Sequence, residues 1–459
     1  MLTRTRFGVG LAAMALALTA CSGTSGASAS AEASDATLAA ASGDEAPPGD
    51  GAPPDGEAPG DGAAPGGGAE VDTGTGAYVL ADGETLDGGT YSSEGDDENA
   101  IRAEGDISAA LESVTVEKTG GGSSSSDASS FYGLNAAILA LDGADLTIDG
   151  GTVTATAEGA NGVLAYGGTI TISDTVIDVS GGNAGGIEVA GGGTLYATDL
   201  TVNATVKAAI RSDRGGGTLV VEGGTYTTSG STGAPAIYST ADISVSDATL
   251  VSEDSEAVVV EGLNSVSITD SDVTGAMSAS ADGGADEQLQ NVMLYQSMSG
   301  DAEEGTSSFT MSGGSLTSLS GDMFYVTNTD AVISLSGVAL TLADGTDLLV
   351  VAGNDGSRGW GTEGANGGTA TVDLAGQSAS GDIVVDEISE LTLSLTGGSD
   401  YTGAVNPDGT AAAALAVDLD ASSTWTLTGD SYVTALTGSL DGIDLDGYSL
   451  YVDGALYTP

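Results

Sequence analysis

The feature that most constrains the fold is a short strand-like segment that recurs every 23 to 25 residues in the middle of the chain. Six copies begin with a triplet whose first and third residues are apolar, starting at Leu146, Ile170, Leu195, Leu219, Ile243 and Val266. A period of two places one side of a strand against a core and the other toward solvent. A regular repeat of this length is typical of a solenoid, in which each unit packs against its neighbours.

Each repeat also keeps a fixed internal register. Four residues after each start stands Gly or Asp, which tolerates the left-handed backbone of a tight corner: Gly150, Asp174, Asp199, Gly223, Asp247 and Asp270. Seven residues after each start stands an inward apolar residue: Val153, Ile177, Val202, Tyr226, Leu250 and Val273. The same offsets recur at Phe309, Gly313 and Leu316, and we assign Trp425, Gly429 and Tyr432 to them as well.

A third strand precedes each pair, with its apolar residue at Ile138, Val163, Ile187, Ile210, Ile237 or Val258. Three short strands per repeat predict an all-β chain, a single right-handed parallel β-helix. Helical repeats are disfavoured because no apolar period of 3.6 exists, and a β-sandwich would not keep one offset over so many units. We expect the β-helix over residues 76–459, with residues 76–99 capping the first coil and residues 440–459 the last.

Three segments, residues 209–217, 235–239 and 291–301, carry a resemblance to a known family. They resemble the pectin-lyase-like right-handed parallel β-helix proteins, and more narrowly uncharacterised bacterial surface lipoproteins of adhesin-like or carbohydrate-binding type. The resemblance covers roughly residues 80–455. It implies the fold but no single function, because this fold hosts lyases, hydrolases, binders and passive spacers.

The first residues predict export and a lipid anchor. Arg4 and Arg6 precede a short apolar run, Gly8–Leu18, which is too short to span a bilayer. This is the layout of a secretory signal peptide, and it ends in Leu18-Thr19-Ala20-Cys21, which resembles the lipobox of bacterial lipoproteins. We expect a signal peptide over residues 1–20, lipidation of Cys21, and a location outside the cytoplasm on the bacterial membrane or cell surface. An ordinary secretory signal with an incidental cysteine is the alternative.

Residues 21–75 are rich in Ala, Gly, Pro, Ser and acidic residues, with almost no large apolar side chain. Such a segment cannot bury a core, so we expect a disordered acidic linker. Like charges repel and extend it. The linker would hold the β-helix away from the membrane.

The charge balance restricts the partners. The chain has 8 Lys and Arg against 66 Asp and Glu, a net charge of −58, and no His. Outside the signal peptide the basic residues are Arg102, Lys118, Lys207, Arg211, Arg214 and Arg358. Nucleic acid binding requires many cations to neutralise phosphates, so we expect no nucleic acid partner. We expect a monomer, since net charge opposes self-association.

The repeat is interrupted at residues 119–135, 276–305 and 353–368, and such insertions often gather on a binding face. The third insertion carries candidate polysaccharide-binding residues: Trp360, Asn354, Asp355, Arg358 and Glu363. An exposed ring stacks on the apolar face of a sugar, while amides and carboxylates bond its hydroxyls. The alternative is that Trp360 folds back over the coil edge and Arg358 pairs with an acid.

A second candidate ligand site is the only dense cationic spot, formed by Arg211, Asp213 and Arg214 together with Tyr238 from the next coil. Arg211 aligns with Glu188 one coil earlier, which predicts a cross-strand ion pair. The functional alternative is a site for an anion or a uronate.

Calcium is the candidate cofactor, and Asp301, Glu303 and Glu304 are its candidate ligands because carboxylates suit this ion. A solvated acidic loop is the alternative reading.

We therefore expect a non-catalytic binding or adhesion protein with polysaccharide as its ligand. The absence of His removes the commonest general base, and no motif marks a catalytic pair. The alternatives are a calcium-dependent polysaccharide lyase or glycoside hydrolase, and a passive structural spacer. A ladder of Thr152, Thr201, Thr225 and Thr249 adds ice binding as a remote alternative, although Val176 and Asp272 interrupt it.

Overall fold

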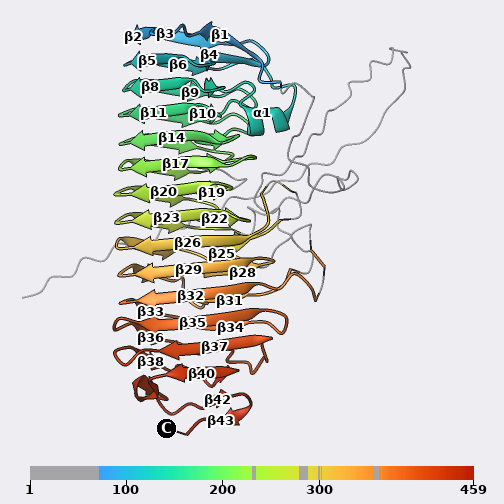
Figure 1. Ribbon diagram of the computed structural model, residues 1–459, viewed down its shortest axis with the longest axis vertical. Coiled ribbons are helices and arrows are strands. Elements are labelled where there is room, and N and C mark those ends of the chain that lie inside the picture. The colour runs from blue at the N-terminus through green and yellow to red at the C-terminus, as the bar shows by residue number, and fades with distance from the viewer. Residues whose placement is uncertain are drawn as a thin grey trace, which may run out of the picture. The chain divides into compact units, whose positions relative to one another are not determined.

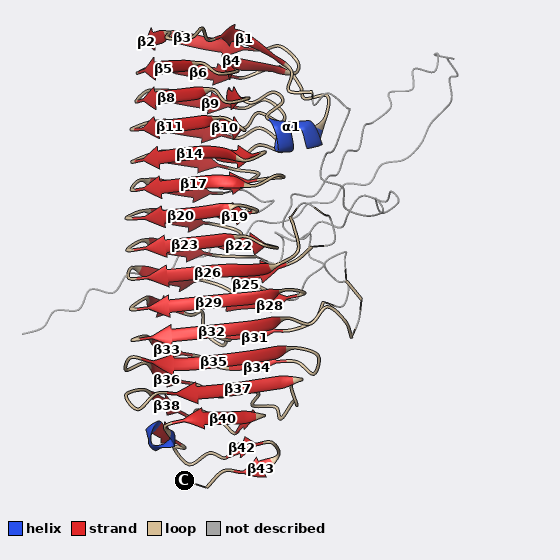
Figure 2. Cartoon of the chain, in the orientation of Figure 1, coloured by secondary structure: helices blue, strands red, loops and turns tan. Residues whose placement is uncertain are grey.

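The protein is represented by a computed structural model that describes residues 72–229, 234–278, 288–297, 300, 302–354, 361–362 and 364–458. In these ranges the chain winds through stacked coils, and each typical coil gives one strand to each of three parallel sheets (Figures 1 and 2). The prediction of a single right-handed parallel β-helix is confirmed.

We call the first sheet sheet A. Its described strands are β1 (Thr75–Val79), β4 (Glu98–Glu104), β7 (Ile138–Leu141), β10 (Val163–Tyr166), β13 (Ile187–Ala190), β16 (Ile210–Ser212), β19 (Ile237–Ser239), β22 (Val258–Glu261), β25 (Gln290–Tyr295), β28 (Asp322–Thr327), β31 (Leu349–Val351) and β34 (Ile383–Val385). The predicted third strand of each repeat belongs to this sheet, since Ile138, Val163 and Ile187 stand side by side in register.

Sheet B contains the triplets that define the repeat. Its described strands are β2 (Thr85–Asp87), β5 (Ser108–Glu112), β8 (Asp145–Asp149), β11 (Thr169–Ser173), β14 (Gly193–Thr198), β17 (Gly217–Glu222), β20 (Asp242–Ser246), β23 (Ser265–Thr269), β26 (Thr306–Ser312), β29 (Asp330–Ser336), β32 (Thr369–Ala375), β35 (Glu390–Thr396), β37 (Ala414–Leu419) and β40 (Ala435–Gly438). Leu146, Ile170 and Leu195 stack in register and are fully buried.

Sheet C follows the corner. Its described strands are β3 (Thr90–Ser93), β6 (Thr115–Lys118), β9 (Thr152–Ala155), β12 (Val176–Val179), β15 (Thr201–Ala204), β18 (Thr225–Thr228), β21 (Thr249–Ser252), β24 (Asp272–Gly275), β27 (Ser315–Ser318) and β30 (Ala339–Thr341). The last coils add two small sheets: β33 (Ser378–Ser380), β36 (Asp400–Thr402), β38 (Thr424–Thr426) and β41 (Ile443–Asp444), and then β39 (Ser431–Val433), β42 (Leu450–Val452) and β43 (Ala455–Leu456).

The corner between sheets B and C is where the predicted Gly and Asp lie. All six have positive φ, from 45° at Asp270 to 70° at Gly223. Gly or Asp is favoured there because most other side chains are sterically strained in this left-handed conformation. Apolar residues from the three sheets fill the interior of the coil as one continuous core.

Two expectations were wrong. The offsets assigned to Trp425, Gly429 and Tyr432 do not hold: Trp425 lies in β38 beside Tyr401 of β36 and not in sheet B, Gly429 has no positive φ, and Tyr432 is half-exposed and not inward. The alternation of inward and outward residues is the same in the strands of every sheet. The residue spacing alone therefore could not show to which sheet the strand of Trp425 belongs. Residues 76–99 do not form a separate cap, because they contain the strands β1, β2 and β3 of the first coil. At the other end β43 turns back antiparallel to β42.

The first insertion contains the helix α1 (Ser126–Tyr132). The Ser125 side chain accepts a hydrogen bond from the Ala128 N–H and starts the helix, and Gly133 ends it with φ 76°. Asn161 and Asn183 donate side-chain hydrogen bonds, each 3.0 Å long, to helix carbonyls. These bonds hold α1 beside sheet A near β10 (Figure 1).

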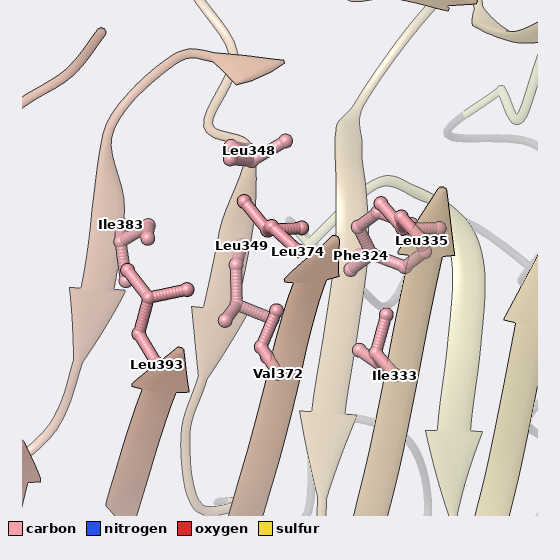
Figure 3. Close-up of a pocket in the computed structure, with 9 residues that line it drawn as sticks. All are labelled: Phe324, Ile333, Leu335, Leu348, Leu349, Val372, Leu374, Ile383 and Leu393. Carbon is pink, nitrogen blue, oxygen red and sulfur yellow. The ribbon is translucent and has the colours of Figure 1, made fainter. Parts of the chain in front are cut away.

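A small apolar cavity lies between sheets A and B inside the coil. Phe324, Leu349 and Ile383 line it from sheet A, and Ile333, Leu374 and Leu393 line it from sheet B (Figure 3). Its lining has no polar surface, so it offers no group that could orient a ligand. We regard it as a packing defect of the core. Within the described ranges, no helix is both long and apolar enough to cross a membrane.

Candidate functional site

The outer faces of the three sheets differ in chemistry. Sheet C presents a ladder of mainly hydroxyl-bearing positions, in which the register aligns Thr152, Val176, Thr201, Thr225, Thr249, Asp272 and Ser315. The outer column of sheet A is apolar, aromatic or charged: Leu139, Leu164, Glu188, Arg211, Tyr238, Val259, Met293, Tyr325, Val350 and Val384. Sheet A is therefore the face that departs most from a solvated strand surface.

All three predicted insertions border sheet A. The first joins β6 to β7, the second joins β24 to β26 and contains β25, and the third joins β31 to β32. The first insertion enters sheet A from sheet C and the third leaves sheet A toward sheet B, so each is attached at one end to this sheet. The second range is only partly an insertion, because β25 is itself a strand of sheet A.

Four of the five described cations also gather on this side. Arg102 and Arg211 lie in strands of sheet A, while Lys207 and Arg214 lie in the turns that flank it. Lys118 ends β6, and its buried ammonium donates to the Gly95 and Gly120 carbonyls at 2.6 and 2.7 Å. Burial lowers the pKa of Lys118. Among the described residues, the outer faces of sheets B and C therefore present acids and hydroxyls without any cation.

The predicted cationic spot is a buried ion cluster. Arg211 Nη1 lies 3.6 Å from Glu188 Oε1, and the same guanidinium is bonded to Asp213. The predicted pair of Glu188 and Arg211 is confirmed. Burial raises the pKa of Glu188 to about 8, and Arg211 opposes that rise while Asp213 adds to it. Because the Asp213 carboxylate already binds the Arg211 guanidinium, Arg211 is poorly placed to bind a uronate as well.

Next to the cluster lies a group of aromatic residues and one arginine, which we call the helix patch: Phe131, which is buried, Tyr132, Tyr166 and Arg214. The rings of Phe131 and Tyr132 meet edge to face at 6.2 Å, and those of Tyr132 and Tyr166 at 5.5 Å. The Arg214 guanidinium lies 4.1 Å from the Phe131 ring centroid, a cation–π distance. Tyr132 and Tyr166 are half-exposed and Arg214 is exposed.

The strands and α1 hold the helix patch in place. Tyr166 points outward at the end of β10, and its ring lies on the backbone of Gly191 in the next coil, where a Cβ would be 2.3 Å from Cε2. Partial burial, with Tyr132 and Asp142 nearby, raises the pKa of Tyr166. Because a small seven-residue helix and a glycine create this surface, it is preorganised rather than assembled from long flexible loops.

Tyr238 lies beside Arg211, as we expected, but it is only half-exposed and its hydroxyl is engaged. Its hydroxyl donates to Glu261, which also accepts from Tyr295 at 3.1 Å. Burial raises the pKa of Tyr238 well above its usual range. The neighbouring Val259, Met293 and Tyr325 are at most 4% exposed, although they point away from the core. The middle of sheet A is therefore no open binding surface.

The third insertion is described only in part. Asp355, Arg358, Trp360 and Glu363 lie outside the described residues, so their binding role stays a prediction. Asn354 is described and is only 3% exposed. Cys21 and residues 22–71 also lie outside the described ranges, as does Asp301.

The calcium prediction gains no structural support. Glu303 and Glu304 are exposed, and within the described ranges no three His, Cys, Asp or Glu side chains are grouped to hold a metal ion.

The helix patch was not predicted as a unit. Phe131 and Tyr132 lie in the first predicted insertion, residues 119–135, but Tyr166 was not among the candidate residues. A signal for it was available in principle, because Tyr166 follows the inward Val163 by three residues and thus points outward. The position of α1 could not be predicted from the sequence.

Comparison with known proteins finds no matching family model, no matching curated protein and no matching solved structure.

Proposed function

We propose that the chain is a non-catalytic polysaccharide-binding lipoprotein, anchored through Cys21, and that the helix patch is its binding surface. The observation that carries this proposal is the run of half-exposed rings of Tyr132 and Tyr166 beside Arg214. Rigid amphipathic rings give a large contact area at low entropic cost, and their hydroxyls remain able to bond a sugar. No other face of the described coil combines these groups with a cation.

The charges favour an uncharged polysaccharide. Arg211 is already held by Glu188 and Asp213, and Arg102 is paired with Glu104 at 2.8 Å. The chain as a whole carries −58. A polyuronate would approach against this field, which acts over about 8 Å at physiological salt. A uronate site at Arg211 is therefore the weaker choice.

The two alternatives find less support. A lyase would need a base that reaches the substrate, whereas Arg211 is 3% exposed and Lys118 is fully buried. The exposed Arg214 lies over the Phe131 ring as a cation, which does not favour the loss of its proton. A passive spacer does not account for an aromatic patch that a dedicated helix builds on one side of the coil.

Affinity electrophoresis of the mature chain tests the proposal. The gels contain hydroxyethylcellulose, xylan, mannan or β-1,3-glucan, and, for comparison, polygalacturonate or alginate. We expect at least one uncharged polymer to retard the chain, and the polyuronates to do so less. Retardation by no polymer would refute polysaccharide binding, and release of reducing or unsaturated sugars would refute the non-catalytic part.

A further inference from the structure

A second pair of exposed rings lies at the C-terminal end of the coil. Tyr432 of β39 and Tyr451 of β42 are register partners, and their rings stack with centroids 4.7 Å apart and planes 8° apart. Both are half-exposed, and Leu456, which lies opposite Tyr451 in β43, is 57% exposed. We call Tyr432 and Tyr451 the terminal tyrosine pair.

The terminal tyrosine pair lies on the same side of the coil as sheet A. Val405 forms a parallel bridge with Ile383 of β34. On its other side, the Val405 carbonyl accepts a 2.9 Å hydrogen bond from the Tyr432 N–H. Strands β39 and β42 therefore continue the stack of sheet A beyond β34. Tyr432 falls in the outer column that also carries Arg211 and Val384.

The distance between the two aromatic surfaces follows from the stacking. About ten inter-strand steps separate β10, which carries Tyr166, from β39, and at ~4.8 Å each they span roughly 50 Å. The outer column between them is buried from Val259 to Val350. Two exposed aromatic surfaces thus stand on one side of a stiff rod, separated by a fixed length.

We propose that the helix patch and the terminal tyrosine pair bind the same polysaccharide chain, so that the ligand is a long polymer and not a short oligosaccharide. The inference rests on the proposed function and deepens it. Once the first surface holds the polymer, the second binds at a high effective concentration, and the combined affinity exceeds that of either surface. This gain requires a chain long enough to span both.

The test compares ligand length with and without the terminal tyrosine pair. Isothermal titration uses the mature chain with size-fractionated cello- and xylo-oligosaccharides and with soluble hydroxyethylcellulose and xylan. We expect the affinity per chain to rise by about tenfold or more once the ligand spans the two surfaces. The Y432A/Y451A double variant should lose that rise but keep the affinity for short ligands. The Y451F variant, which retains the ring, should keep it.

The outcomes separate the two proposals. If short ligands bind but affinity does not rise with length, or if Y432A/Y451A keeps the rise, the two-surface inference is wrong while polysaccharide binding stands. If no ligand of any length binds, both proposals fall. Circular dichroism of Y432A/Y451A and Y451F confirms that the coil end remains folded.

Discussion

Arg211 of β16 lies directly beside Glu188 of β13, with Nη1 and Oε1 3.6 Å apart, on the outer face of a sheet. Neither Glu188 oxygen has a hydrogen bond within the described residues, and the side chain is fully buried. Burying a charge under these conditions destabilises more than a single ion pair stabilises. The carboxyl of Glu188 therefore holds its proton to an unusually high pH.

This relationship makes stability depend on pH. Because the pKa of Glu188 rises from 4.5 to about 8 on folding, its contribution is fully present below pH 4.5 and is lost as the pH rises through 8. We expect the E188Q variant to unfold at a higher urea concentration than the parent at pH 9, with a free energy of unfolding larger by at least ~1.4 kcal/mol, which corresponds to a tenfold change in proton affinity. The two should converge near pH 4. The exposed Glu222, changed to Gln, is the control, and an equal effect there would contradict the assignment.

Asp347 gives a second, smaller pH effect. It is half-exposed and close to Asp322 and Asp382 of neighbouring coils, and burial together with these charges raises its pKa from 3.8 to about 6. The stability tied to its proton is present below pH 3.8 and is lost as the pH rises through 6. After allowance for solvent screening, D347N should be about 1 kcal/mol more stable than the parent at pH 7. Urea unfolding at pH 7 measures this difference. If D347N is less stable than the parent, the ionised Asp347 carboxylate stabilises the fold, which would contradict the prediction.

Tyr226 occupies the core of sheet C with an unsatisfied hydroxyl. It is fully buried, and its hydroxyl has no hydrogen-bond partner within the described residues. Because an unpaired buried polar group costs about 1–3 kcal/mol, Y226F should raise the free energy of unfolding by about 1 kcal/mol. Tyr401 is the matched control, since its hydroxyl donates to the Gly381 and Ala404 carbonyls at 3.1 Å. Y401F should destabilise, and equal effects from the two variants in urea unfolding would contradict this account.

Gly223 tests the corner between sheets B and C. Its φ is 70°, and a Cβ there would lie 2.2 Å from Asp199 Oδ1 of the preceding coil. Gly337 turns the same corner with φ 63° and open space around its Cα. G337A measures backbone strain alone, about 1 kcal/mol, while G223A should lose more because Asp199 must also move. Thermal unfolding of both variants tests this prediction. A larger loss of stability in G337A than in G223A would contradict the close stacking of Gly223 on Asp199.

The fold could be predicted because the same pattern recurs in many successive coils. Each coil carries the same inward apolar residues and the same left-handed corner, so a single misread residue changes little. Where the coils shorten, the pattern around Trp425 misled us, since period two does not say to which sheet a strand belongs. The ion pair of Glu188 and Arg211 was predictable because stacking in register turns a sequence offset into a neighbour.

The candidate site was harder to predict. The helix patch joins α1 to a strand one coil away, and nothing in the repeat places the insertion that contains α1. Likewise Tyr238 was expected to be exposed, but its hydroxyl bonds Glu261 one coil further along. The strand register predicts which backbone segments are neighbours. Whether an outward-pointing side chain is buried depends on where the insertions lie, which the register does not predict.

The central claim is that the helix patch binds an uncharged polysaccharide, and one comparison tests it most directly. The affinity of Y166A for the polymer that the mature chain retains is measured beside that of Y196A, which removes an equally aromatic and 46% exposed ring from sheet B. We predict that Y166A loses at least about tenfold in affinity, as expected for an aromatic anchor, while Y196A binds like the parent. Equal binding by both variants, or a loss confined to Y196A, would contradict the claim.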